Sequence, residues 1–183
     1  MPEKLQIIFR MKRNIFTIVI IFIGFVSIAQ EEHHNDFKHF RISPVLSHTY
    51  IPLATINGNE TVIIPTLGLD LEYWFTEKWG FGFHNDLELL TFEIEKDHQL
   101  FVEKEFPVVL TLDSLWKFYK DWVLVFGTGI EIETNENLFI VRTGIEYEIE
   151  FGNHWDVAPT VFYDYRSNNF STWSIGIGIG KRF

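Results

Sequence analysis

The last twelve residues of the chain alternate between two kinds of side chain. Residues 172–183 read Thr-Trp-Ser-Ile-Gly-Ile-Gly-Ile-Gly-Lys-Arg-Phe. One set of alternate positions is apolar and the other is small, namely Trp173, Ile175, Ile177 and Ile179 against Ser174, Gly176, Gly178 and Gly180. A period of two over this length predicts a β-strand, because successive side chains of a strand point to opposite faces. An unpaired apolar strand edge promotes aggregation, so this strand needs neighbours, and pairing with the first strand would close a barrel.

Residues 11–29 have the three parts of a secretory signal peptide. The basic start Met11-Lys12-Arg13 precedes a run of 14 uncharged residues, and Ser27-Ile28-Ala29 provides a cleavage site of the small-x-small type. The run is shorter than the roughly 20 apolar residues that a transmembrane helix needs. We therefore predict a signal peptide over residues 1–29, with Met11 as an alternative start, and one barrel domain over residues 30–183.

The net charge and the cysteine content limit the classes of partner and of covalent attachment expected for the mature chain. The full sequence has a net charge of −10, and residues 1–29 carry four basic side chains and one acidic side chain, so the mature chain has a net charge of −13. Such a chain is not expected to bind nucleic acid, nor an anionic lipid surface through basic patches. The sequence contains no cysteine, which excludes disulfides and a lipoprotein anchor attached through cysteine.

Eight alternating segments follow one another in the mature chain. They span about residues 37–50, 61–76, 79–93, 104–117, 122–133, 138–151, 154–167 and 172–183. Each is long enough for the tilted strand of about 9–11 residues that crosses a bilayer. The connections at 76–78, 119–121 and 152–153 are tight, whereas 51–60 and 94–103 are predicted to be long loops. Short turns on one side and longer loops on the other are typical of transmembrane barrels with an even number of strands.

Two kinds of eight-stranded barrel fit this alternation. A soluble ligand carrier such as a lipocalin turns its apolar face inward, whereas a membrane barrel turns it outward. Two features favour the membrane barrel. Glycines share the polar face with long charged side chains, and an eight-stranded interior is just wide enough to be filled by side chains. Aromatic residues also flank the short turns, as in the girdle at a membrane interface. These aromatic residues are Trp74, Phe75, Trp79, Trp116, Trp122, Phe151 and Trp155.

The interior of such a barrel is predicted to be acidic. The carboxylates that point inward are Asp70, Glu72, Asp86, Glu88, Asp113, Glu131, Glu133, Glu146, Glu148, Glu150, Asp156 and Asp164. The groups that oppose them are Arg41, Arg142, Arg166, Arg182, His39 and His84. Counting the register from the turns places Arg142 opposite Asp164, and Asp70 opposite His84. We predict a salt-bridge network with water that fills the interior, since buried charges must be paired and hydrogen-bonded. In the alternative interpretation, the surplus carboxylates bind or pass cations, as charge rings do in pores.

Three other residue sets give weaker indications of chemistry. Metal-ligand types occur near the mature N-terminus, but without a fixed histidine spacing, so we predict a solvated tail there. They are Glu31, Glu32, His33, His34, Asp36 and His39. Ser43, Ser47, His48 and His84 have the residue types of a hydrolase, but nothing sets a nucleophile beside a base. The glycines of the last strand precede no helix and form no nucleotide-binding loop. We predict no enzyme activity, no metal and no cofactor.

The last strand resembles the C-terminal strand of small bacterial outer-membrane β-barrels, which characteristically ends on phenylalanine, as Phe183 does here. The resemblance covers most of the mature chain. It departs at Lys181, where an aromatic residue is common in that family, although a lysine near the interface can snorkel. The resemblance implies an eight-stranded antiparallel up-and-down transmembrane barrel, an outer-membrane location and contact with lipid. It also implies that the barrel-assembly machinery recognises the terminal strand, that is Trp173, Ile175, Ile177, Ile179 and Phe183.

Roles in that family include structural anchoring, adhesion, small-solute passage and lipid modification, and the fold alone does not select among them. We expect a non-catalytic barrel with a structural or surface-interaction role. The alternative is a narrow, porin-like barrel that prefers cations or binds a small solute in its acidic lumen.

Overall fold

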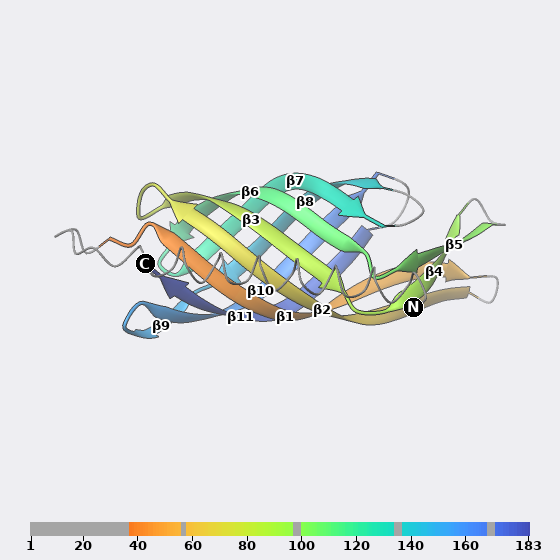
Figure 1. Ribbon diagram of the computed structural model, residues 1–183, viewed down its shortest axis with the longest axis horizontal. Helices are drawn as coiled ribbons and strands as arrows, with labels where there is room; N and C mark the ends of the chain where they lie inside the picture. Colours follow the sequence, from red (N-terminus) through yellow and green to blue (C-terminus); the bar gives the residue numbers. More distant parts are fainter. Residues whose placement is uncertain (1–36, 56–57, 97–99, 134–136, 168–170) are drawn as a thin grey trace, which may run out of the picture. The chain divides into compact units, whose positions relative to one another are not determined.

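The computed structural model describes residues 37–55, 58–96, 100–133, 137–167 and 171–183. Residues Phe37–Arg182 form one compact unit built of β-strands (Figure 1). The strands are β1 (Phe40–Thr55), β2 (Gly58–Trp74), β3 (Trp79–Glu88), β4 (Thr91–Lys96), β5 (Leu100–Glu105), β6 (Val108–Tyr119), β7 (Trp122–Ile132), β8 (Leu138–Tyr147), β9 (Ile149–Gly152), β10 (Trp155–Arg166) and β11 (Ser171–Arg182). In the described part of the chain, no helix is long and apolar enough to cross a membrane. The predicted signal peptide lies outside the described residues.

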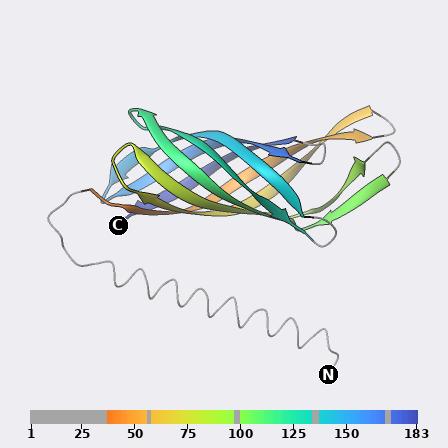
Figure 2. The ribbon, with the colours of Figure 1, turned by 90° about the horizontal axis from the view of Figure 1, so that it is seen from above.

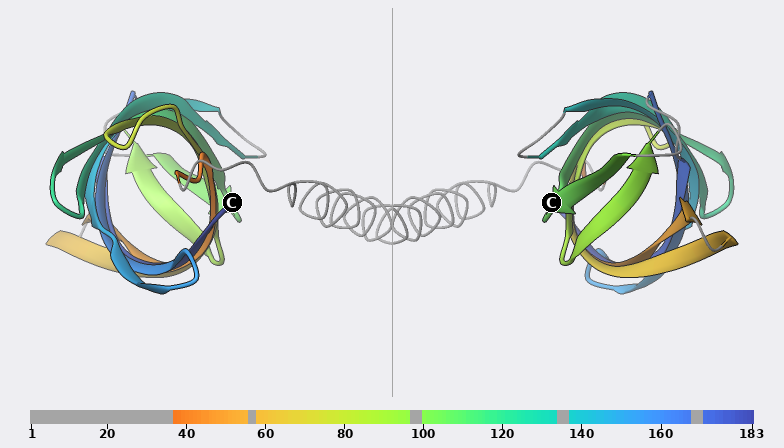
Figure 3. Two further views of the ribbon diagram at one scale, coloured as in Figure 1. Left: turned by 90° about the vertical axis from the view of Figure 1, so that its left-hand side faces the viewer. Right: turned by 90° about the vertical axis from the view of Figure 1, so that its right-hand side faces the viewer.

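Eight of the strands close into an antiparallel barrel. Their order around the barrel is β1, β2, β3, β6, β7, β8, β10 and β11, and β11 pairs back onto β1. In this closing pair Leu46 lies opposite Ile177, and Tyr50 lies opposite Trp173. Figure 3 shows the strands as a ring in both end views. The pairing of the last strand with the first, predicted from the alternation of residues 172–183, is confirmed.

The tight turns lie at the end of the barrel where β1 begins and β11 ends (Figure 1). They join β2 to β3, β6 to β7, and β9 to β10. Lys120, Asn153 and His154 have positive φ angles of 46°, 50° and 61°, which place them in the left-handed region that tight turns use. Because short turns face the periplasm in outer-membrane barrels, the opposite end is the one expected to face outward.

The connections at that opposite end differ from the prediction. Residues 51–55 and 58–60 extend β1 and β2 instead of forming a long loop, and residues 94–96 and 100–103 belong to the β4–β5 hairpin. Both hairpins project beyond the barrel in Figure 2. The pairing of β1 with β2 continues to Thr55 opposite Gly58. The connections from β7 to β8 and from β10 to β11 lie partly outside the described residues.

The outer face of the barrel is apolar and the inner face is polar. Leu46, Leu112 and Ile177, each near the middle of a strand, are 63%, 69% and 49% exposed. A soluble barrel would bury such residues, because exposed apolar surface of this extent is unfavourable in water. The structure therefore has the inverted arrangement of a membrane barrel, as predicted, and excludes the lipocalin-like alternative.

Aromatic side chains lie on the outer face near both ends of the barrel. Near the short turns, Trp79 stacks on Trp116 with ring centroids 5.4 Å apart. At the other end, Tyr163 and Trp173 have ring centroids 4.7 Å apart, and this second group was not predicted.

Trp74 was wrongly assigned to the girdle, because it is buried inside the barrel. It shares the inward side of β2 with Asp70 and Glu72, so its position in the alternation, and not its closeness to a turn, decides its face.

One interior glycine fits against the backbone of its neighbour. A Cβ added to Gly129 of β7 would lie 1.9 Å from the carbonyl oxygen of Leu110 on β6. We expect Gly129→Ala to lower the free energy of unfolding by about 1–3 kcal/mol, as overpacking does. Gly178→Ala is the matched control, since its nearest contact is the Ser43 hydroxyl, which can rotate away. Urea unfolding in detergent micelles measures both, and an equal loss in the two variants would contradict the prediction.

Candidate functional site

The charged residues predicted to point inward form the candidate site, here called the lumen network. The structure buries the following members: Asp70, Glu72, His84, Glu88, Asp113, Glu131, Arg142, Glu146, Glu148, Asp156, Asp164 and Arg166, together with Arg41 and Arg182. Asp86 and Glu133 are half-buried. The alternation of the strands thus places almost all predicted members on the inner face.

Glu150 was predicted to point into the interior, but it is exposed. Strand β9 keeps the register that β8 has against β10, so Glu150 lies on the same side as Glu146. However, β7 begins at Trp122, opposite Tyr147, and provides no neighbour for β9. Glu150 therefore stands beyond the rim of the barrel, where alternation no longer implies burial.

The part of the network nearest the short turns is centred on Arg41. Its Nη2 lies 2.6 Å from Asp156 Oδ1, and its Nη1 pairs with Glu72. The second oxygen of Glu72 accepts a hydrogen bond of 2.6 Å from Trp74 Nε1. Because these residues come from β1, β2 and β10, the cluster links strands on both sides of the β1–β11 pair that closes the barrel.

Glu148 forms ion pairs with two further basic side chains at this end. Arg182 Nη2 and Lys117 Nζ each lie 2.5 Å from one of its oxygens. Lys117 was not among the predicted members. It lies on β6 next to the outward-facing Trp116, so the alternation could have placed it on the inner face. Two cations on one carboxylate explain how Glu148 is tolerated in the interior.

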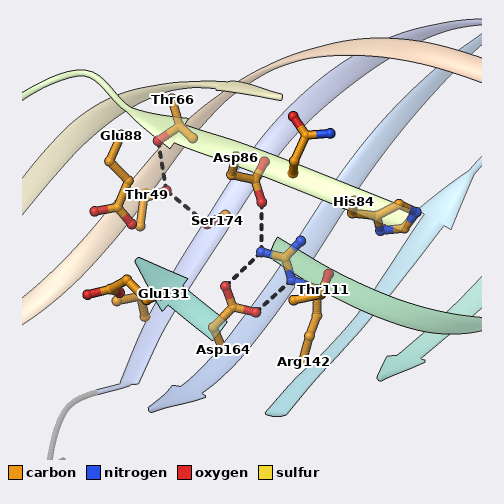
Figure 4. Close-up of polar contacts among 12 residues, drawn as sticks. Thr49, Thr66, His84, Asp86, Glu88, Thr111, Glu131, Arg142, Asp164 and Ser174 are labelled. Atoms are coloured by element: carbon orange, nitrogen blue, oxygen red, sulfur yellow. Dashed lines mark hydrogen bonds and ion pairs between the residues drawn. The ribbon is translucent and has the colours of Figure 1, made fainter. Parts of the chain in front are cut away.

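The middle of the network is centred on Arg142. Its Nε and Nη2 lie 2.7 and 2.8 Å from the two oxygens of Asp164, and Nη2 is also 2.7 Å from Asp86 (Figure 4). The guanidinium lies 5.0 Å from the ring centroid of Phe162. The fork of donors on an arginine suits two carboxylates at once, which a lysine could not reproduce. The predicted pairing of Arg142 with Asp164 is confirmed by the register of β8 and β10.

The outer part of the network is centred on Arg166. Its Nη2 lies 3.1 Å from Glu88, its Nε pairs with Glu131, and its Nη1 donates to the Thr172 hydroxyl. A row of hydroxyl groups lies beside this cluster: Thr49 Oγ1 is 3.0 Å from both Thr66 Oγ1 and Ser174 Oγ (Figure 4). The three arginine clusters therefore follow one another along the interior.

The serine and histidine residues considered as residue types of a hydrolase form no nucleophile–base pair: neither Ser43 Oγ nor a ring nitrogen of His84 has a hydrogen-bond partner among the described residues. His48 is exposed on the outer face of β1, whereas Ser43 and Ser47 are buried on the inner face. A base and a nucleophile on opposite faces of one strand cannot exchange a proton directly. His39 Nδ1 lies 2.7 Å from the Trp74 carbonyl oxygen. The remaining residues of the N-terminal set, Glu31 to Asp36, lie outside the described residues.

One cluster within the network has the ligand types of a metal site. Asp70, His84 and Glu146 each offer one donor atom, and these atoms lie within 4.8 Å of one another. Asp70 and His84 are register partners on β2 and β3, as predicted from the turn between them. Glu146 comes from β8, and no local sequence signal relates it to the other two.

The chain resembles several solved structures, including these three. Ail, the attachment invasion locus protein of Yersinia pestis, matches 80% of this chain and 100% of its own, at 12% identity and a TM-score of 0.55. The N-terminal β-barrel domain of Pseudomonas aeruginosa OprF matches 80% and 100%, at 11% identity and a TM-score of 0.53. Neisserial surface protein A matches 79% and 97%, at 11% identity and a TM-score of 0.52. The chain has the fold of the small bacterial outer-membrane β-barrels.

At these identities the likeness concerns the fold. No protein-family model and no curated protein matches the sequence. The fold and the apolar exterior together are those of a barrel that spans a membrane in contact with lipid.

Proposed function

We propose that this outer-membrane barrel is non-catalytic and has a structural or surface-interaction role. The observation that carries the proposal is the succession of three arginine clusters, centred on Arg41, Arg142 and Arg166, along the interior. Ion pairs between different strands fasten the wall of an eight-stranded barrel and leave little room for a solute path. A barrel closed in this way acts through its ends and its lipid-facing surface.

The end opposite the short turns offers the interaction surface. There, β1 and β2 continue to Thr55 and Gly58, and the β4–β5 hairpin projects beyond the barrel (Figure 2). The sequence of residues 91–105 contains five acidic and two basic residues. Ail has been crystallised in complex with the heparin analogue sucrose octasulfate, a polyanion. An acidic hairpin favours the opposite chemistry, so we propose a basic protein surface as the partner.

The excess of buried carboxylates supports the alternative, a barrel that binds or passes cations. Nine buried aspartate and glutamate side chains face four buried arginines among the described residues. Rings of carboxylates select cations in open pores, so the two functions are separated by whether the lumen conducts.

The closed barrel predicts that the purified protein produces no discrete conductance steps in planar lipid bilayers. Insertion is verified by recovering the protein from the membrane and showing heat-modifiable gel migration, the mark of a folded barrel. Nonspecific leak is measured with protein denatured before reconstitution. Reproducible cation-selective openings of the folded protein would contradict the closed barrel and support the transport alternative.

A further inference from the structure

Asp70, His84 and Glu146 meet in the interior from distant parts of the sequence. Strands β3 and β8 are separated around the barrel by β6 and β7, yet one donor atom of each residue lies within 4.8 Å of the other two. All three residues are at least nine-tenths buried. The set, here called the imidazole–carboxylate cluster, lies between the clusters of Arg41 and Arg142.

The histidine of this cluster lacks a hydrogen-bond partner. His84 is 1% exposed; its Nε2 has no hydrogen-bond partner among the described residues, and its Nδ1 lies 3.2 Å from Asp113 Oδ2 without the alignment of a hydrogen bond. In Figure 4 its ring lies along β3 from Asp86, away from the Arg142 guanidinium. A buried polar group without such a partner is unfavourable, and in native structures it usually indicates a bound water, ion or functional role.

The two carboxylates are also incompletely paired. The side chain of Asp70 is only 4% exposed, yet it has no hydrogen bond or ion pair with any residue in the described part of the chain. Oε1 of Glu146 has no hydrogen-bond partner among those residues, and its other oxygen is 3.8 Å from Arg41. The nearby Arg142 is occupied by Asp86 and Asp164. Two buried, incompletely paired carboxyl groups beside an imidazole whose Nε2 has no hydrogen bond can be stabilised by a bound cation.

We propose that Asp70, His84 and Glu146 bind a divalent transition-metal ion of the zinc class. An imidazole nitrogen with two carboxylate oxygens is a common zinc donor set, whereas Ca²⁺ and Mg²⁺ prefer oxygen ligands alone. The ion neutralises the two carboxylates and supplies the missing partner of His84. The site goes beyond the proposed surface role, because a bound ion fastens β2 and β3 to β8 whatever the outer end binds.

A neighbouring carboxylate is placed to orient the histidine. Asp113 Oδ2 lies 3.2 Å from His84 Nδ1 and accepts a hydrogen bond of 2.5 Å from Thr111 Oγ1. Histidine ligands of zinc commonly direct their second ring nitrogen to such a carboxylate. This arrangement leaves Nε2 of His84 as the nitrogen for the ion.

The test uses the mature chain refolded into detergent with Zn²⁺, because the buried ligands are best loaded while the barrel forms. His33→Gln and His34→Gln are introduced into every sample to remove metal binding by the N-terminal histidines. After exhaustive dialysis, folded protein is expected to retain one Zn²⁺ per chain. Loss of a group that only supports a metal ligand can weaken metal binding by roughly 100-fold. His84→Gln and Glu146→Gln remove ligands themselves, so each is expected to weaken Zn²⁺ binding by at least about that factor. His48→Gln, on the outer face, should retain the ion.

Cobalt substitution and X-ray absorption give readouts that do not depend on a variant folding. Bound Co²⁺ should show visible ligand-field bands, and bound zinc should show one nitrogen ligand at about 2.0–2.1 Å. Folded protein without stoichiometric metal would overturn the proposal in favour of a water-filled cluster. Retention of the ion by folded His84→Gln protein would overturn it as well.

Discussion

Replacing Arg142 with methionine is expected to lower the free energy of unfolding by about 3–5 kcal/mol, the range for removing one partner of a buried ion pair. Methionine is an apolar side chain that replaces the stem of the arginine but not the guanidinium, which lies 5.0 Å from the Phe162 ring centroid, so the charge is the principal loss. Asp164 and Asp86 would then remain in the interior without the guanidinium that lies 2.7 Å from each of them. Reversible urea unfolding in lipid vesicles, followed by tryptophan fluorescence, measures the change.

Arg182→Met is the matched control for this prediction. Its partner Glu148 keeps Lys117 at 2.5 Å and Arg41 at 3.8 Å, so the loss should be clearly smaller. Adding Asp164→Asn to Arg142→Met should restore part of the stability, because the cost arises from the carboxylate left behind. If the single variant is as stable as the wild-type protein, the Arg142 cluster does not fasten the barrel.

The fold was largely predictable because period-two alternation determines which face of a strand meets lipid. The alternation of Ile175, Ile177 and Ile179 with glycines was enough to predict a closing strand, and β11 pairs with β1. The register from each short turn was equally predictable, because a tight turn fixes which residues lie opposite one another. That rule gave both Arg142 with Asp164 and Asp70 with His84.

The errors lie where alternation stops being informative. Beyond the rim, a residue such as Glu150 can be in register with the inward-facing residues and still be exposed to solvent. Residues 51–60 and 94–103 were predicted to be long loops, because both segments contain polar residues that loops and exposed hairpins use alike. Trp74 was misplaced because aromatic residues near turns occur on either face, and hydrogen bonding to Glu72 accommodates this one inside.

We predicted no metal from the sequence, and the members of the proposed metal site were only half predictable as neighbours. Asp70 and His84 are neighbours through the local β2–β3 turn, whereas Glu146 reaches them from across the barrel. Contacts across the interior depend on the tilt and stagger of all eight strands, which no single turn determines. For this reason the sequence identified the acidic interior but neither the cluster nor the role of Lys117.

Ile177→Arg is expected to destabilise the barrel by about 2–4 kcal/mol, the cost of an arginine on the lipid face at the bilayer midplane. Ile177 lies midway along β11 and is 49% exposed on the outer face. Phe151→Arg provides a control for depth, because Phe151 is exposed beside a short turn and the cost falls to about 0–1 kcal/mol near the interface. Urea unfolding in vesicles measures both, and equal losses would contradict a membrane-spanning β11.

Deleting Phe183 should affect a different step. If the assembly machinery reads the terminal residue before the fold exists, the deletion impairs insertion in cells but reduces the stability of the finished barrel by only about 1–2 kcal/mol, part of the burial of one aromatic side chain. Ile177→Arg, by contrast, should impair folding in cells and in refolding from urea alike. Heat-modifiable migration scores the folded fraction of each variant in both settings. Equal defects of the Phe183 deletion in cells and in refolding would show that this residue acts through stability, because a recognition signal is needed only where the machinery is present.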